Sequence, residues 1–123
     1  MKKILIVEDS STTRALLRAA IEDLGEDFDT HEATTGFEAL KLLPSGGFDL
    51  ILTDINMPDI NGLELINFVK TNAAYSHIPL IIVSTERSEE DRKRGLALGA
   101  KAYVTKPFNA EELKETIGKV LNL

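Results

Sequence analysis

The sequence predicts an α/β fold, a (βα)5 doubly wound arrangement in which a parallel five-stranded sheet carries helices on both faces. Several apolar runs lack the in-and-out alternation of a half-exposed strand, which is typical of strands that are covered on both faces. These runs lie at residues 4–7, 50–52, 79–83 and 102–104. Segments with helical spacing separate the runs, and such alternation favours a parallel sheet. A weaker run at residues 28–33 would add a fifth strand nearer an edge.

The first helix is expected over residues 12–24, with Gly25 as its C-terminal cap. Helical spacing would place a set of small and apolar side chains near one face of this helix. The set consists of Leu16, Ala19, Ala20 and Leu24.

The later helices have recognisable starts and stops. A helix over residues 36–43 would end at Pro44, because proline removes a backbone donor, and another is expected over residues 62–72. Gly99 would close the fourth helix. Capping-box-like pairs mark the starts of the last two helices: Ser88 with Asp91, and Asn109 with Glu112.

Length and composition indicate one globular domain, residues 1–123, with an ordinary share of 43% hydrophobic and 28% charged residues. Because 20 acidic residues outnumber 14 basic ones, we expect no nucleic-acid partner. The absence of cysteine excludes a disulfide framework and a thiolate metal site. No apolar stretch is long enough to span a bilayer or to form a signal peptide. We therefore expect a cytoplasmic monomer without a membrane partner.

Complementary chemistry stands at the ends of four predicted strands. In a doubly wound sheet, ligands bind at the carboxyl ends of the strands, so these ends should share one cleft. The residues concerned are Glu8 and Asp9 after the first strand, Asp54 after the third, Ser84 after the fourth, and Lys106 with Pro107 after the fifth. Taken singly, each would more simply be a helix cap, a loop hydroxyl or a surface charge. Taken together, they favour a functional site.

Three carboxylates in one cleft repel one another unless a divalent cation neutralises them. Ligands that offer only oxygen favour Mg²⁺ over zinc. Lys106 and Ser84 would add a positive charge and a hydroxyl donor for a phosphoryl group. Asp54, facing these groups, would be a nucleophile towards phosphorus, and an in-line transfer requires mainly positioning and charge neutralisation.

The motifs VED (7–9), LTDINMPDINGLEL (52–65), VST (83–85) and AYVTKPF (102–108), in this order and at this spacing, resemble the receiver domain of bacterial response regulators. The resemblance covers essentially the whole chain and implies the flavodoxin-like strand order 2-1-3-4-5. It also implies a phospho-accepting role in a two-component phosphorelay. The SSTTR segment after the acids, with Asn56 and Glu86, is most similar to chemotaxis-type single-domain regulators.

The resemblance assigns a phosphoryl chemistry to the strand ends. Asp54 would accept the phosphoryl group from a phosphohistidine on a sensor histidine kinase or a phosphotransfer domain, and Lys106 would pair with that group. Mg²⁺ would be held by Glu8, Asp9 and Asp54 and by the backbone carbonyl of Asn56.

The resemblance also implies a switch and its tuning. Ser84 would move to bind the phosphoryl group, Tyr103 would then move inward, and a downstream partner would bind the face formed by the fourth helix, fifth strand and fifth helix. A cis peptide bond would precede Pro107. Asn56 and Glu86 would tune hydrolysis of the phosphoaspartate, and Thr85, bulkier than the usual residue, would narrow access for small phosphodonors.

Four alternatives remain open at this point. The chain could be a receiver excised from a longer regulator. A haloacid-dehalogenase-like phosphatase would need a second aspartate where Asn56 stands. In a flavin-binding module, Glu8 and Asp9 would repel the phosphate of the flavin. A receiver-shaped binding module that is never phosphorylated is disfavoured by the intact set of Asp54, Ser84 and Lys106.

Overall fold

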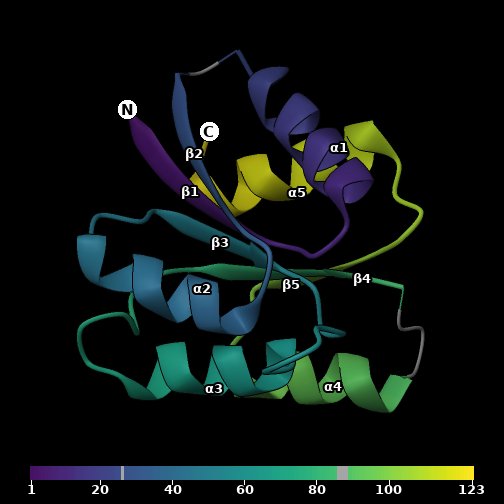
Figure 1. The fold of residues 1–123 in the computed structure, drawn as a ribbon. Coiled ribbons are helices and arrows are strands. Elements are labelled where there is room, and N and C mark those ends of the chain that lie inside the picture. Colours follow the sequence, from purple (N-terminus) through teal and green to yellow (C-terminus); the bar gives the residue numbers. More distant parts are fainter. Residues whose placement is uncertain (26, 86–88) are drawn as a thin grey trace.

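Five parallel strands form the centre of the molecule in the order β2-β1-β3-β4-β5 (Figure 1). The computed structural model describes residues 1–25, 27–85 and 89–123. The strands are β1 (Lys2–Val7), β2 (Phe28–Ala33), β3 (Leu50–Thr53), β4 (Leu80–Ser84) and β5 (Ala102–Thr105). The predicted strand order is confirmed, including the edge position of the weakly apolar second strand.

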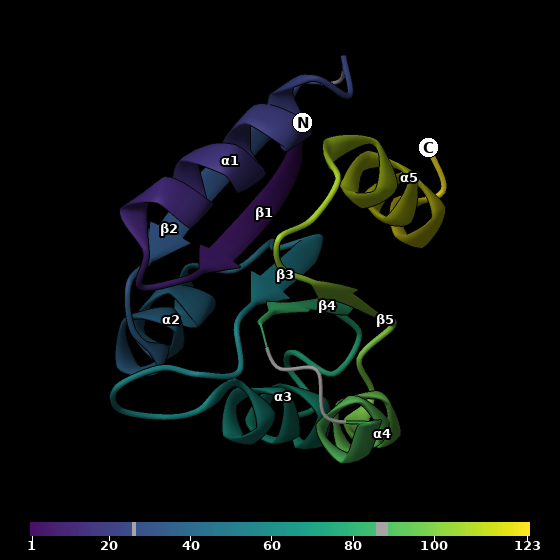
Figure 2. The same cartoon turned by 90° about the vertical axis from the view of Figure 1, so that its right-hand side faces the viewer.

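Helices cover both faces of this sheet. Helices α1 (Ser11–Glu22) and α5 (Ala110–Leu121) lie on one face, and α2 (Gly36–Leu42), α3 (Gly62–Thr71) and α4 (Glu89–Leu98) lie on the other (Figures 1 and 2). A 3-10 turn, η1 (Leu43–Ser45), follows α2 and contains Pro44. Among the described residues, no helix has the length and apolar character needed to cross a bilayer.

The strand registers place the functional strand ends at one level. Val7 of β1 lies beside Thr53 of β3, so the next residues, Glu8 and Asp54, leave the sheet together. Two hydrogen bonds extend the ladder to these residues, since the Asp54 N–H donates to the Val7 carbonyl at 3.1 Å and the Glu8 N–H to the Ala33 carbonyl at 2.9 Å. The acids therefore emerge from a rigid, fully buried part of the sheet.

The buried face of α1 differs from the prediction. Leu17, Ala20 and Ile21 pack into the core, whereas Leu16 is 54% exposed. Both sets of residues have helical spacing, but Leu17 and Ile21 bury more apolar surface than Leu16 and Ala19, and the burial of apolar area decides the helix rotation. The helix also ends earlier than expected, with Asp23 as its C-terminal cap in place of Gly25.

Two other predicted caps, at the start of α5 and at the end of α4, are confirmed. Asn109 starts α5, and its side chain accepts hydrogen bonds from the N–H groups of Glu111 and Glu112. Gly99 follows the end of α4 with a φ of +121°, a conformation that favours glycine. Ser88 lies outside the described residues.

Candidate functional site

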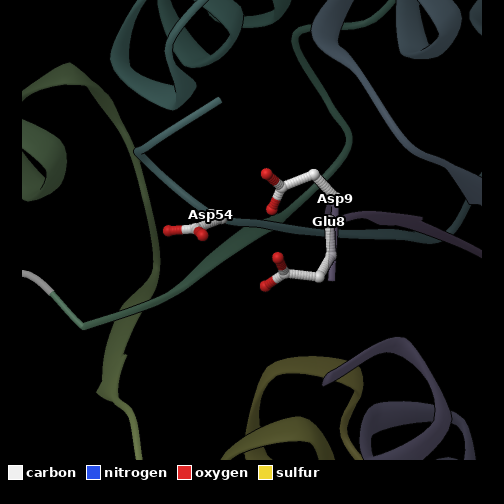
Figure 3. Close-up of side chains that lie close together, drawn as sticks. All are labelled: Glu8, Asp9 and Asp54. Carbon is white, nitrogen blue, oxygen red and sulfur yellow. The ribbon is translucent and has the colours of Figure 1, made fainter. Parts of the chain in front are cut away.

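The ends of β1 and β3 bring three carboxylates together. Oxygen atoms of Glu8, Asp9 and Asp54 all lie within 4.8 Å of one another. In Figure 3 the carboxyl groups of Glu8 and Asp9 point from the end of β1 towards the side on which Asp54 lies. Glu8 and Asp54 are buried, and Asp9 is exposed. The predicted acidic cluster therefore forms, with one member open to solvent.

The carboxylate of Asp54 is held by backbone groups of its own loop. Its Oδ1 accepts hydrogen bonds from the N–H of Ile55 at 2.7 Å and from the N–H of Asn56 at 3.3 Å. Gly62, the first residue of α3, packs directly on the backbone of Asp54 and Ile55, and its N–H donates to the Ile55 carbonyl at 2.8 Å. A side chain at this glycine would collide with the Asp54 carbonyl, so the close approach of α3 helps to fix the acid.

Lys106 supplies the positive charge at the cluster. Its Nζ lies 2.5 Å from Oε1 of Glu8 and 3.1 Å from Oδ2 of Asp54. The end of β5 delivers it beside β4, where the Lys106 N–H donates to the Ser84 carbonyl at 2.8 Å. The peptide bond between Lys106 and Pro107 is cis, as the resemblance implies.

The pKa values of Glu8 and Lys106 are both raised, but for different reasons. Burial raises the pKa of Glu8 above its ordinary value of 4.5, although the ammonium of Lys106 partly offsets the effect. Burial alone would lower the pKa of Lys106, but its hydrogen bond to Glu8 and the charges of Asp54 and Glu8 hold that pKa above 10.5. The lysine therefore stays charged at neutral pH, where it partly neutralises the acids.

Beside Lys106, a cavity of about 340 Å³ opens to the surface. Its walls are Thr13, Leu16, Thr85, Lys106, Pro107 and Phe108. Ser84 is fully buried at the end of β4, and Thr85 is exposed at the cavity. Glu86 lies outside the described residues.

The predicted switch residue, Tyr103, is 9% exposed and belongs to the core. Its neighbour across the β4–β5 ladder is Ile82, on which Gly95 of α4 packs closely. Earlier in α4, the guanidinium of Arg92 lies over the Tyr103 ring, with its carbon 5.8 Å from the ring centroid. In this structure the ring thus occupies an inward position between β4, β5 and α4.

Comparison with known proteins decides the family. The model of the response regulator receiver domain matches residues 4–118. The chemotaxis protein CheY of Pseudomonas aeruginosa is 40% identical over 118 residues, which are 96% of this chain and 94% of that protein. The chain belongs to the response regulator receiver domain family.

Solved structures of receivers share the fold. The chemotaxis response regulator CheY4 of Vibrio cholerae has a TM-score of 0.88 at 36% identity, covering 98% of this chain and 99% of that one. The Mn²⁺-bound form of the response regulator Rcp1 has a TM-score of 0.83 at 27% identity, covering 99% of this chain and 91% of that one. Family membership makes this chain a signalling protein and sets aside the phosphatase and flavin alternatives.

The acidic cluster of this receiver suits a hard divalent cation. Receiver domains generally bind Mg²⁺ at acidic residues. Here Glu8, Asp9 and Asp54 each offer a carboxylate oxygen to a metal ion. Oxygen donors are the ligands that Mg²⁺ prefers, and the ion usually keeps several waters. The exposed position of Asp9 leaves one side of the cluster open for them.

Two residues around the receiver site were not foreseen. The Arg14 side chain reaches back to the loop that carries Glu8 and Asp9, and Asp59 joins the loop after Asp54 to the start of α2. One signal for Arg14 was available, because a cation near the N-terminus of a helix opposes the helix dipole and so suggests another role. Asp59, in a turn-forming segment, gave no comparable signal.

Proposed function

We propose that Asp54 is the phosphoacceptor of this receiver and takes the phosphoryl group from a phosphohistidine on a sensor histidine kinase or a phosphotransfer domain. The observation that carries the proposal is the buried Asp54 carboxylate, which shares the Lys106 ammonium with Glu8 at the rim of the sheet. An oxygen of Asp54 would form the new bond to phosphorus as the bond from phosphorus to the imidazole nitrogen breaks. The electron pair of the broken bond stays on that nitrogen.

Each neighbour has a stated part in this transfer. The N–H groups of Ile55 and Asn56 orient the Asp54 carboxylate, and Lys106 offsets the negative charge of the incoming phosphoryl oxygens. Ser84, at the end of the neighbouring strand, would donate its hydroxyl to a phosphoryl oxygen. Positioning and charge neutralisation are what an in-line phosphoryl transfer mainly requires.

The metal of the site would be Mg²⁺, held by Glu8, Asp9 and Asp54 with the backbone carbonyl of Asn56 as a further ligand. When bound, Mg²⁺ supplies positive charge against the phosphoryl oxygens. A similar receiver, Rcp1, has been solved in a Mn²⁺-bound form, which supports a divalent cation in this fold.

The output would be a change in partner binding by a single-domain, cytoplasmic and monomeric regulator of chemotaxis type. The names of the similar CheY proteins support that pathway. Movement of Ser84 and Tyr103 would alter the face formed by α4, β5 and α5, where a downstream target protein binds. The site would also assist its own dephosphorylation, at a rate tuned by Asn56 and Glu86, whereas Thr85 would limit access of small phosphodonors.

Intact-mass measurement tests the phosphoacceptor. The protein is incubated with Mg²⁺ and phosphoramidate, and in parallel with a phosphorylated histidine kinase domain. We expect the gain of one phosphoryl group, its slow loss on standing, and no gain in Asp54→Asn. The matched control is Asp29→Asn, which removes a partly buried carboxylate on β2 and should be modified like the wild type. A wild-type protein that gains no phosphoryl group from either donor would overturn the proposal.

A further inference from the structure

The side chain of Arg14 turns back from α1 over the loop that carries two of the site acids. Its Nη1 donates to the backbone carbonyl of Glu8 at 2.9 Å and to that of Asp9 at 3.1 Å. The Arg14 side chain is only 18% exposed. Its hydrogen bond to the Glu8 carbonyl is partly buried, and the one to the Asp9 carbonyl is open to solvent. One guanidinium nitrogen thus spans two consecutive carbonyls of the metal-site loop.

A residue from the edge strand fixes the other side of the guanidinium. Oε1 of Glu32, in β2, accepts from Nε of Arg14 at 3.1 Å, and Oε2 of Glu32 accepts from Nη1 of Arg18 at 2.6 Å. A planar guanidinium with donors in a fixed fork can hold a carboxylate and the two carbonyls at the same time. The connection therefore runs from β2 through Arg14 to the backbone of Glu8 and Asp9.

We propose that Arg14 is a positioning residue for the metal site, which acts by fixing the backbone from which the Glu8 and Asp9 carboxylates project. This inference rests on the proposed function, because it assumes that these acids bind the metal. Asp9 is the exposed member of the cluster, so its carboxylate depends on the loop backbone for its position. Groups that orient metal ligands from outside typically change metal affinity about 10–100-fold when they are removed.

The sign of the effect separates positioning from simple electrostatics. Arg14 is a cation near a cation site, so its charge alone weakens Mg²⁺ binding, and its removal would then strengthen binding. If Arg14 positions the loop, its removal weakens binding instead. If Arg14 only stabilises the fold, its removal lowers Tm without changing the Mg²⁺ affinity.

The test is an NMR titration with Mg²⁺ that follows the backbone amides of Asp9 and Ser10, combined with Tm measured without metal. We expect the Kd for Mg²⁺ to rise on the order of 10-fold in Arg14→Ala. A smaller rise is expected in Arg14→Lys, because one ammonium cannot replace the fork, and in Glu32→Gln, which loses the ion pair. Arg18→Ala is the matched control, since Arg18 binds the same Glu32 but neither loop carbonyl, and its Kd should stay within about twofold of the wild type.

An unchanged or lower Kd in both Arg14 variants would overturn the inference, as would an equal rise in Arg18→Ala. If Arg14→Ala does not fold, the Kd values of Arg14→Lys and Glu32→Gln test the inference: a rise in both supports it, and an unchanged or lower Kd in both overturns it. A wild-type protein whose Asp9 and Ser10 amides do not respond to Mg²⁺ would overturn the magnesium site itself. Failure of the proposed function is therefore distinguishable from failure of the inference about Arg14.

Discussion

At the scale of single residues, Gly62 has the strictest space requirement around the phosphoacceptor. A Cβ at this position would overlap the carbonyl of Asp54 and lie 2.8 Å from Cα of Ile55, and neither backbone can move without disturbing the site. We expect Gly62→Ala to lower the free energy of unfolding by about 1–3 kcal/mol, as overpacking usually does. Phosphoryl uptake by the folded fraction should also slow, because Asp54 is displaced. Urea unfolding and time-resolved intact mass measure the two effects.

Gly118 in α5 provides the control for that substitution. A Cβ there meets no atom within 4 Å. Gly118→Ala should therefore raise the free energy of unfolding by about 0.4–1 kcal/mol, because it only restricts the unfolded chain. Equal stabilities of the two variants would show that α3 can move away from Asp54 without cost.

Thr85 is the residue at which access of small phosphodonors can be tested. It shares the wall of the cavity beside Lys106, so a shorter side chain would widen the approach. We expect Thr85→Ala to take up a phosphoryl group from phosphoramidate several-fold faster than the wild type, measured as the initial rate by intact mass. Thr71→Ala, an exposed threonine at the end of α3, should match the wild type. Equal rates in Thr85→Ala and the wild type would show that the Thr85 side chain does not limit the access of phosphoramidate to the site.

At the scale of elements, the sequence pattern predicted strands better than helix rotation. The central strands are buried on both faces, so their apolar runs leave no choice of face. In α1, two stripes with helical spacing competed, and contact with the sheet selected the one with Leu17 and Ile21. Periodicity alone could not rank the two stripes, because the choice depends on tertiary packing.

The loop between β3 and α3 is tied to α2 by Asp59. Its Oδ1 accepts from the N–H of Gly36 at 3.0 Å and its Oδ2 from the N–H of Phe37 at 2.9 Å. Burial alone would raise the pKa of Asp59, but these hydrogen bonds and one from Ile60 hold it below 3.8. A carboxyl group with a lowered pKa in the folded state contributes stability above its unfolded pKa, and this contribution is lost as the pH falls through the folded pKa.

We therefore expect Asp59→Asn to have a lower Tm than the wild type near neutral pH and the same Tm in acid well below pH 3.8. Thermal melts followed by circular dichroism across this range measure the difference. Asp27→Asn, which removes an exposed carboxylate near the start of β2, is the control and should show no such pH-dependent gap. A gap for Asp59→Asn that persists unchanged in acid would mean that its carboxylate charge is not the stabilising feature.

At the scale of the whole molecule, the sequence indicated the site through topology. Because parallel strands end on one rim, Glu8, Asp54 and Lys106 could be grouped although they lie far apart in the chain, and the structure brings them together. Arg14 and Asp59 were missed because they act on backbone groups of neighbouring loops. Which carbonyl or N–H such a side chain reaches depends on how the loops pack against β2 and α2, and residue spacing does not specify that.

If the assembled acids bind Mg²⁺ as proposed, we expect the stability of the whole fold to depend on the metal. Three neighbouring carboxylates, one of them fully buried, oppose folding without a cation, and a ligand that binds only the folded state adds RT ln(1 + [L]/Kd). At a Mg²⁺ concentration ten times its Kd, this amounts to about 1.4 kcal/mol. For a chain of this length, we expect Tm to rise by about 5 °C, measured against NaCl at equal ionic strength.

Asp9→Asn should change which protein has the higher Tm, the variant or the wild type, according to whether Mg²⁺ is present. Without Mg²⁺ its Tm should exceed that of the wild type, because one of the mutually repelling charges is gone, and with Mg²⁺ its Tm should rise much less, because a ligand is gone. Asp29→Asn, which leaves the cluster intact, should keep the wild-type rise. If Mg²⁺ raised the Tm of Asp9→Asn as much as that of the wild type, the ion would be acting on the general negative charge of the protein. A Tm of Asp9→Asn that lies above the wild-type Tm without Mg²⁺ and below it with Mg²⁺ is thus the result expected for a metal bound at the end of β1.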